Sequence, residues 1–438
     1  MTMAEQARYD IGFEEALACT LQTLAPLAPV GVPVGEAEGL VVAEDCTALV
    51  DCPSSSISLK DGYAVVSPDL IDASASIPVR LKVVGRAVAG TDAKATVRPG
   101  TAVKVTSGAR VPPGADAVIA SEFTTDQGEW VLCRRDVGRG RNIMERGQDA
   151  AAGTRIAVRG ETITPARTGL LAAGGVAAIR VHPRPRIGII ATGDEVVAPG
   201  NPLKDGQIYA SNVITVRSWL RHFRMNAEVA VVGDHREHLA GQAAAMLERV
   251  DALITSGGAW KSDRDLTVDV LKAMGADLVF HRVRMGPGKA VALLMIGGKS
   301  LFCLPGGPPS KEIAFLQITL PGLLHLSGKP PVPFEYTCGL LTDRIGGDRD
   351  WTQFTYAALE WKDDRWLVHP LKVRSRLQSQ AEADALIRVP EGVEQVEPGT
   401  WVRVQMLRPG RRDRVLHGGR EPAGGSTTMP AGGCCGHE

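Results

Sequence analysis

Three runs of β-branched and aliphatic residues in the second half of the chain each stop at a glycine-rich turn. The turns lie at residues 192–195, 255–258 and 305–310, and a segment that can form a helix follows each of them. In a parallel α/β sheet such turns gather at the carboxyl edge of the strands, where glycine lets the backbone approach a ligand and helix amino termini attract anions. One such turn is often only a connection, but three with interleaved acidic residues predict one site for an anionic ligand.

The small and polar residues of these turns are the first candidates for ligand contacts. Backbone N–H groups and hydroxyls there can donate hydrogen bonds to phosphate-type oxygens. Lys289 follows a Gly-Pro-Gly turn and gains nothing structural from so rigid a setting, so we expect it to meet an anion. Together with Lys289, the candidates are Thr192, Gly193, Ser256, Gly257, Gly258, Gly306 and Ser310.

The composition limits the classes of protein to which this chain can belong. A chain of 438 residues is too long for one compact core, so two to four domains are expected. Its 49 basic residues balance 49 acidic ones, which leaves no global field to attract nucleic acid or a membrane surface. No apolar run reaches transmembrane length, and residues 1–10 lack the apolar core of a signal peptide. These features predict a soluble cytoplasmic protein without nucleic-acid or membrane partners.

The eight cysteines do not form a recognisable framework. Six are scattered without the spacing of a metal site or a disulfide network, so most are expected to be buried apolar residues. The other two, Cys434 and Cys435, lie beside His437 in a final segment rich in Gly, Pro and Arg. Such a group could bind a soft metal or undergo redox chemistry, but two cysteines and one histidine fall short of a closed site. We favour an untethered, disordered tail.

The first half of the chain combines helical and strand patterns. Apolar residues recur at helical spacing in residues 12–27, and Thr164 can cap a second helix whose first position is Pro165. Between them, residues 77–133 carry short alternating strands separated by Gly and Pro turns. This pattern indicates a small β domain inserted into a helical linker domain.

The second half is typical of an α/β domain followed by a β domain. Strands alternate with predicted helices at residues 212–223, 236–249 and 266–274, which favours a right-handed parallel sheet. Gly328 and the prolines after it indicate a linker into the last domain. The multidomain α/β plus β fold is thus an N-terminal helical linker domain (1–53 and 146–183), the inserted β domain (54–145), a central parallel α/β domain (184–328), a C-terminal β-barrel-like domain (333–407) and a disordered tail (408–438).

Short motifs in a fixed order carry a family resemblance. They lie at residues 58–65, 106–109, 112–118, 192–195, 206–212, 255–258, 287–289 and 375–392. Through them the chain resembles the molybdopterin molybdenumtransferases, the family of MoeA and the gephyrin E domain, from about residue 12 to residue 406. The resemblance implies an elongated homodimeric enzyme whose α/β domain binds molybdopterin. It would take adenylylated molybdopterin and molybdate, use Mg²⁺, release molybdenum cofactor and AMP, and have molybdoenzyme apoproteins as further partners.

Cleavage of a pyrophosphate calls for a divalent cation, and magnesium prefers a few carboxylates with water and phosphate oxygens. Glu195 follows a strand end and Asp265 precedes the helix predicted at residues 266–274, so both should face the carboxyl edge as metal ligands. Asp265 could equally be a helix N-cap, which would stabilise the helix by about 1 kcal/mol. Asp234 also precedes a predicted helix and could be a cap, so the resemblance is the main reason for including it among the catalytic candidates.

The resemblance also carries over residues outside the α/β domain. Alone, Asp61 would be an ordinary Asp-Gly turn. The family places this motif across the dimer interface, close to where molybdate is inserted, and on that basis Asp61, Ser58, Thr106 and Asp149 are candidates. An aspartate there could orient a hydrated oxyanion or accept a proton.

The chain departs from the family pattern at several positions. A glycine, Gly286, replaces a lysine of the Lys-Pro-Gly-Lys motif, and Lys261 and Arg264 could compensate for the lost charge. Other changed positions are Ser56, Ile57, Leu59, Lys60, Ala210 and Gly307. These changes leave open a pterin-binding scaffold without catalysis. A tungstate-inserting variant also stays open, because molybdate and tungstate have the same charge and nearly the same size. A third alternative is an adenylyltransferase acting on molybdopterin. It is disfavoured, because such proteins lack the added β domains that this chain contains.

Overall fold

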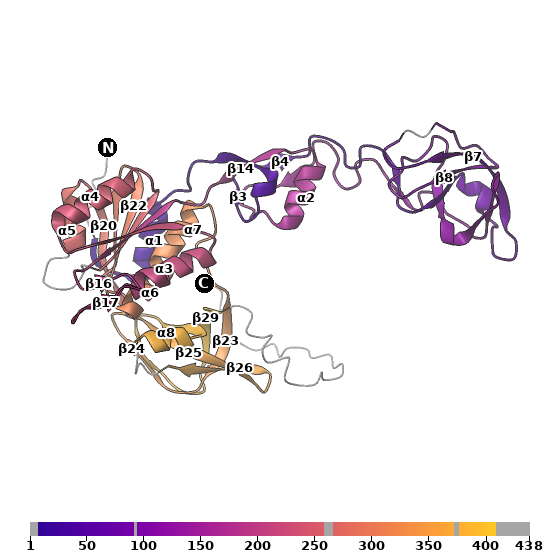
Figure 1. The fold of residues 1–438 in the computed structure, drawn as a ribbon. Coiled ribbons are helices and arrows are strands. Elements are labelled where there is room, and N and C mark those ends of the chain that lie inside the picture. Colours follow the sequence, from indigo (N-terminus) through magenta and orange to yellow (C-terminus); the bar gives the residue numbers. More distant parts are fainter. Residues whose placement is uncertain (1–7, 92–93, 258–265, 372–375, 409–438) are drawn as a thin grey trace. The chain divides into compact units, whose positions relative to one another are not determined.

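The computed structural model describes residues 8–91, 94–257, 266–371 and 376–408. Its contacts divide the chain into two compact units, Met1–Leu27 with Arg184–Glu438, and Ala28–Pro183 (Figure 1). Each is described by itself. The predicted tail with Cys434 and Cys435 lies outside the described residues. Within those ranges no helix has both the length and the apolar character needed to cross a bilayer.

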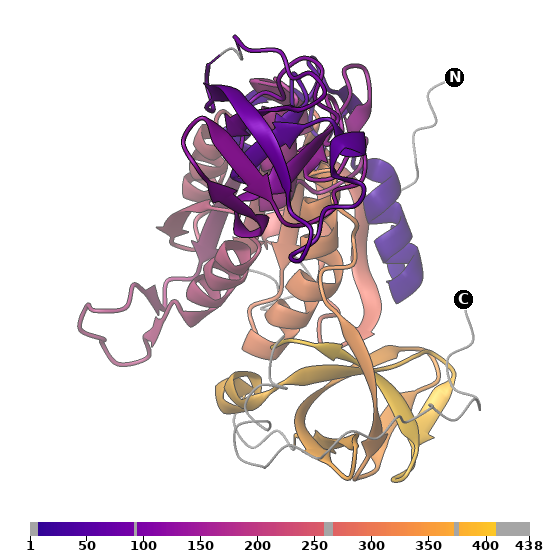
Figure 2. The ribbon, with the colours of Figure 1, turned by 90° about the vertical axis from the view of Figure 1, so that its right-hand side faces the viewer.

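The predicted N-terminal helix is α1 (Phe13–Thr23). It follows β1 (Arg8–Gly12), which pairs in parallel with β20 (Asp277–Gly286), and it packs against α7 (Leu320–Leu326) (Figure 2). These residues therefore belong to the α/β unit, whereas the sequence placed residues 1–53 in the linker domain. Pairing between strands about 270 residues apart leaves no local sequence signal.

The central sheet is mixed. Its order is β18-β15-β19-β22-β21-β20, with β18 (Ala227–Val232), β15 (Ile187–Thr192), β19 (Ala252–Ser256) and β22 (Lys299–Leu304) all parallel. The strand β21 (Ala292–Ile296) runs antiparallel to β22 and β20, which corrects the prediction of a wholly parallel sheet. Gly297 and Gly298 both adopt positive φ and form a two-residue hairpin turn that reverses the chain.

Helices cover both faces of this sheet. Alternate residues of β15 point to opposite cores, so Ile189 packs with α3 (Ser211–His222) and Ile190 packs with α4 (Arg236–Leu247). A strand buried on both faces explains the continuous aliphatic run in its sequence. The remaining helical segments are α5 (Leu266–Ala273), α6 (Pro308–Ala314) and the π-helical η4 (Phe315–Thr319) leading into α7.

The loop after β15 differs from the prediction. It does not pass directly into a helix, because two short strands, β16 (Val196–Val197) and β17 (Ile208–Tyr209), pair with each other before α3 begins. The other two glycine-rich turns lead towards α5 and α6 as expected.

The C-terminal domain is a closed barrel, in agreement with the prediction. The ring runs β25-β26-β23-β29-β27 and closes by pairing β27 with β25. Its elements are β23 (Tyr336–Leu341), β24 (Ile345–Asp348), β25 (Thr352–Lys362), β26 (Arg365–Pro370), α8 (Arg376–Glu382), β27 (Ala385–Val389), β28 (Val393–Val396) and β29 (Trp401–Met406).

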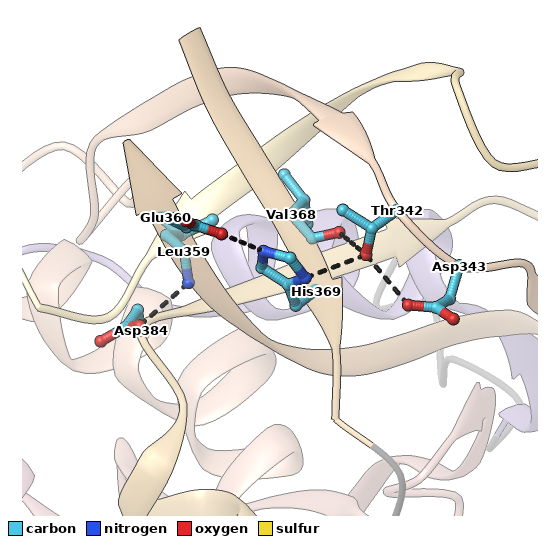
Figure 3. A network of polar contacts seen from close by, with 7 residues as sticks. All are labelled: Thr342, Asp343, Leu359, Glu360, Val368, His369 and Asp384. Carbon is cyan, nitrogen blue, oxygen red and sulfur yellow. Dashed lines mark hydrogen bonds and ion pairs between the residues drawn. The ribbon is translucent and has the colours of Figure 1, made fainter. Parts of the chain in front are cut away.

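Polar contacts and a shared core fix this barrel. His369 contacts Glu360 and Thr342, each at 3.1 Å, and the carboxylate of Asp384 accepts a hydrogen bond from Leu359 N (Figure 3). The ring of Phe354 meets that of Phe13 edge-on, with the ring centroids 5.4 Å apart. The barrel therefore shares a core with the α/β domain.

The second unit contains the linker domain and the inserted β domain. Thr164 caps α2 (Pro165–Ala173), as predicted, by accepting a hydrogen bond from Arg167 N at 3.2 Å. The short linker elements are β2 (Val30–Pro33), η1 (Val34–Glu36), β3 (Val41–Val42), β4 (Cys46–Thr47), β13 (Arg155–Ala157) and β14 (Ala178–His182).

The inserted domain is a six-stranded sheet of order β10-β11-β7-β8-β6-β9. The short strands predicted within residues 77–133 correspond to β7, β8, β9 and β11, whereas the start of β6 follows the predicted Asp-Gly turn at Asp61. The elements are β5 (Ile57–Ser58), β6 (Gly62–Val65), η2 (Ser67–Leu70), β7 (Val79–Ala87), β8 (Thr101–Val105), β9 (Ala117–Ala120), η3 (Ser121–Phe123), β10 (Thr124–Asp126), β11 (Trp130–Cys133) and β12 (Ile143–Met144).

Candidate functional site

The three glycine-rich turns lie side by side at the carboxyl edge of the parallel strands. A Cβ atom built on Gly257 would lie 2.4 Å from the carbonyl oxygen of Thr192, and one built on Gly306 would lie 3.9 Å from the Cα of Gly257. The φ of Gly257 is +113°, which L-residues rarely adopt. Only glycine therefore lets the first two turns approach this closely.

Two threonines lie near the ends of the strands at this edge: Thr192 is the last residue of β15, and Thr255 is the second-to-last residue of β19. The Oγ1 atoms of Thr192 and Thr255 are buried, and neither has a hydrogen-bond partner in the described part of the chain. A buried hydroxyl without a partner costs about 1–3 kcal/mol, which a ligand or solvent contact would offset. Ser256, the last residue of β19, is also buried, whereas Gly258 lies outside the described residues.

The third turn joins β22 to α6. Gly307 is the N-cap of α6, and Pro308 and Pro309 occupy the next two positions. Proline has no N–H group, so within the first three helical positions only Ser310 can donate from its backbone. Donors at this turn are therefore few, and the orientation of each peptide group matters.

Lys289 lies on a neighbouring turn. The peptide bond between Gly286 and Pro287 is cis, and a Cβ atom on Gly288 would lie 3.4 Å from the carbonyl oxygen of Ser310. The Lys289 turn therefore lies against the start of α6.

An aromatic residue of the barrel meets this lysine. The Nζ atom of Lys289 lies 4.7 Å from the centre of the Trp351 ring, a cation–π distance. The contact follows from the pairing of β20 with β25, in which Met285 is the partner of Thr352. Sequence reasoning missed Trp351, because no local pattern links it to Lys289.

The predicted carboxylates have different surroundings. Glu195 is exposed and follows the end of β15 at this edge. Asp194 stabilises the loop instead, because its Oδ1 accepts a hydrogen bond from Asp234 N at 3.0 Å. Asp234 is exposed and immediately precedes His235, the N-cap of α4.

Asp265, the second residue of the predicted metal pair, lies outside the described residues, as do Lys261 and Arg264. Among the residues that are described, no three His, Cys, Asp or Glu side chains gather into a metal-binding group.

In the second unit, Asp61 and Thr106 line one hollow of about 420 Å³. The Oδ1 atom of Asp61 accepts a hydrogen bond from Ser107 N at 2.8 Å, which fixes the carboxylate at the start of β6. Arg86 and Lys104 also line the hollow. The hollow is thus lined by two carboxylates, Asp61 and Asp126, and by two cationic side chains.

An ion pair forms one wall of this hollow. Lys104 Nζ lies 2.6 Å from Asp126 Oδ2, which also accepts a hydrogen bond from the Tyr63 hydroxyl at 2.8 Å. Burial, followed by the bond to Asp126, raises the pKa of Tyr63 to about 12, so this phenol stays protonated at neutral pH.

Two candidates of this unit lie outside the lining of that hollow. Ser58 is buried, and its hydroxyl donates to Lys60 O at 2.6 Å and accepts from Lys60 N at 3.3 Å, so it stabilises its own turn. Asp149 is exposed, and its backbone N–H donates to Cys52 O. Neither side chain lines the hollow around Asp61.

Two buried charged residues on α6 were missed by sequence reasoning. Lys311 and Glu312 are 0% and 5% exposed. Burial lowers the pKa of Lys311 to about 8, while the nearby Glu312 acts in the opposite direction. Burial and contact with Glu312 also raise the pKa of Tyr356. The one available signal was a Lys-Glu pair opening a strongly apolar segment.

Three family models match successive parts of the chain. The MoeA N-terminal region (domains I and II) matches residues 11–175, a probable molybdopterin binding domain matches residues 188–325, and the MoeA C-terminal region (domain IV) matches residues 339–407. The turns and Lys289 described above all lie within the second match.

Named relatives and solved structures agree with these matches. The chain is 33% identical over 385 residues to molybdopterin molybdenumtransferase 2 of Mycobacterium tuberculosis, covering 86% of this chain and 94% of the relative. It is 32% identical to molybdopterin molybdenumtransferase of Bacillus subtilis, covering 84% and 87%. A molybdopterin biosynthesis MoeA protein from Pyrococcus horikoshii has a similar structure, with a TM-score of 0.77, 30% identity and coverage of 91% and 99%. The chain belongs to the molybdopterin molybdenumtransferase family.

Proposed function

We propose that this protein is a molybdopterin molybdenumtransferase, which inserts molybdate into adenylylated molybdopterin and releases AMP. Family membership along nearly the whole described chain supports the reaction class. The observation that carries the proposal is the convergence of the turns at Thr192, Gly257 and Gly306, with the Lys289 turn against α6. This arrangement offers backbone donors, hydroxyls and one cation to a phosphate-bearing ligand.

In this proposal the α/β edge binds the anionic part of the pterin. The hydroxyl of Thr192 and the backbone N–H groups of the turn at Gly306 donate to phosphate oxygens, and the ammonium group of Lys289 supplies positive charge. The ring of Trp351 restricts the ammonium group to one side of its turn, which reduces the entropy lost when the ligand binds.

Magnesium would bind to Glu195, with Asp265 as the second ligand predicted from sequence. The exposed carboxylate of Glu195 fits such an ion, which prefers carboxylates together with water and phosphate oxygens. When bound, it would neutralise charge that develops on the pyrophosphate as AMP leaves.

Asp61 has a separate role in the proposal. Its carboxylate, fixed by Ser107 N, would orient molybdate or accept a proton, and Thr106 in the same hollow could donate to an oxyanion. Following the family pattern, we propose a homodimer in which Asp61 of one copy serves the α/β edge of its partner. The cytoplasm would be the compartment of this reaction.

The test supplies the purified chain with adenylylated molybdopterin, Mg²⁺ and molybdate. We expect AMP release that depends on molybdate, together with activation of a molybdoenzyme apoprotein. Pterin binding without molybdate-dependent AMP release, in conditions where a family member is active, would instead identify a scaffold. A parallel reaction with tungstate distinguishes a tungstate-inserting variant.

A further inference from the structure

The two buried charged residues of α6, Lys311 and Glu312, have no part in the proposed reaction. Burying a charged side chain is unfavourable unless hydrogen bonds compensate for the lost water. Each of the two is compensated, but by different parts of the molecule. Their partners show what each residue holds in place.

Lys311 contacts the start of α3. Its Nζ atom donates to the backbone oxygen of Asn212 at 2.9 Å and to the side-chain oxygen Oδ1 at 3.1 Å. Because Lys311 can only donate, it fixes the oxygen side of the Asn212 amide. The amide nitrogen Nδ2 must then point the other way, and it donates to the carbonyl oxygen of Gly306 at 2.5 Å.

This chain of contacts orients one peptide group of the third glycine-rich turn. A trans peptide is planar, so its N–H and C=O groups point in opposite directions. Since the Gly306 carbonyl points to Asn212, the N–H of Gly307 points away from it. Within the described residues this N–H has no hydrogen-bond acceptor.

We propose that Lys311 is a positioning residue that acts through Asn212 to present the Gly307 N–H to the anionic part of the substrate. The inference rests on the proposed function and adds a determinant of substrate binding to it. The turn has few donors, because Pro308 and Pro309 follow Gly307. Loss of one correctly oriented N–H would therefore weaken the binding of the substrate.

Glu312 provides the matched control on the same helix. Its carboxylate accepts hydrogen bonds from Trp219 Nε1 at 2.7 Å, from the Tyr356 hydroxyl at 2.7 Å and from Gln380 Nε2 at 2.6 Å. Two of these partners belong to the barrel domain, and none is itself a residue of the glycine-rich turn, although Gln380 Nε2 also donates to Pro308 O of that turn at 3.1 Å. A change at Glu312 disturbs a buried charge on α6 without breaking the contacts between Lys311, Asn212 and Gly306.

The experiment compares the full chain with four variants: Lys311→Met, Asn212→Ala, the double variant and Glu312→Gln. Titration with adenylylated molybdopterin gives Kd, molybdate-dependent AMP release gives KM and kcat, and thermal unfolding reports folding. We expect Lys311→Met and Asn212→Ala each to raise Kd and KM about tenfold, the size of one hydrogen bond to an anion, with kcat within about twofold. The double variant should be no weaker than either single one, because both act on one peptide group.

Several results would overturn the inference. A folded Lys311→Met variant with unchanged Kd, additive losses in the double variant, or an equal loss in Glu312→Gln would each do so. If Lys311→Met does not fold, Asn212→Ala still decides, because it breaks the contact to Gly306 and keeps the lysine. A wild-type chain that binds the pterin but releases no AMP would contradict the proposed reaction, while its Kd values would still test Lys311. A wild-type chain that does not bind the pterin would overturn both.

Discussion

The close approach of Gly257 to Thr192 predicts the effect of a single methyl group. In Gly257→Ala the new Cβ would lie 2.4 Å from Thr192 O and 2.8 Å from Thr192 Oγ1. Real Cβ atoms essentially never come this close to such atoms, so the two turns must separate. Overpacking of this kind costs about 1–3 kcal/mol, and a side chain at positive φ costs about 1–3 kcal/mol more. We therefore expect a loss of roughly 2–6 kcal/mol in the free energy of unfolding.

A second glycine separates the two contributions. Gly275 has a φ of +94°, and a Cβ atom added there would meet no heavy atom within 4 Å, so Gly275→Ala isolates the backbone strain. Urea denaturation measures the free energy of unfolding for both variants. Gly257→Ala should lose at least about 1 kcal/mol more than Gly275→Ala, and it alone should lose pterin binding. Equal stability losses, or retained pterin affinity in Gly257→Ala, would refute the packing argument.

Four further predictions concern charged side chains. Lys289→Ala should raise Kd for adenylylated molybdopterin about tenfold or more in a binding titration, because it removes a cation from the anion site; an unchanged Kd would remove Lys289 from the site. Asp61→Ala should preserve that Kd and reduce molybdate-dependent AMP release by about a hundredfold or more, as for a lost general base; normal AMP release would exclude the role. Glu195→Gln should increase the Mg²⁺ concentration needed for half-maximal AMP release, and an unchanged requirement would contradict Mg²⁺ binding there. Lys311 should make stability depend on pH. Its folded pKa of about 8 is below the unfolded value of 10.5, so the unfolded state binds more protons and the cost of burial diminishes as pH rises through this interval. Between pH 7.5 and 9.5 the wild type should gain about 2 kcal/mol relative to Lys311→Met in urea unfolding, and no relative gain would contradict the burial of an ammonium group.

Much of the fold was predictable because its signals are local. A few consecutive residues are enough to specify the aliphatic run of β15, the cap at Thr164 and the glycine-rich turns. One missed feature depends on a distant partner: the strand β1 pairs with β20, about 270 residues away, and nothing in a short sequence window specifies that pairing. The other, the antiparallel hairpin of β21 and β22, has a local signal in Gly297 and Gly298 that the sequence prediction did not use.

The candidate site was likewise predictable only where its residues come from local turns. Thr192, Gly257 and Gly306 come from turns whose shape is local, and the structure brings them together. Ser58 was carried over as a ligand contact, but its hydroxyl is occupied by its own turn. Trp351 comes from the barrel and could not be linked to the site before the barrel was in place.

Lys311 is the clearest case in which tertiary contacts place a residue where its type would not be expected. A lysine is rarely buried completely, and only the juxtaposition of α3 and α6 gives its ammonium group two acceptors. Its contribution to the turn at Gly306 passes through Asn212, almost one hundred residues away in sequence. Tertiary packing determined both its burial and its partners.

The central claim is that the turns at the carboxyl edge form one site for the anionic part of a pterin substrate. Its most direct measurement is a crystal structure of the chain with adenylylated molybdopterin bound. We expect phosphate oxygens within hydrogen-bonding distance of the Gly307 N–H, of Thr192 Oγ1 and of Lys289 Nζ. Well-defined pterin density away from this edge, with Lys289 directed to solvent, would contradict the account.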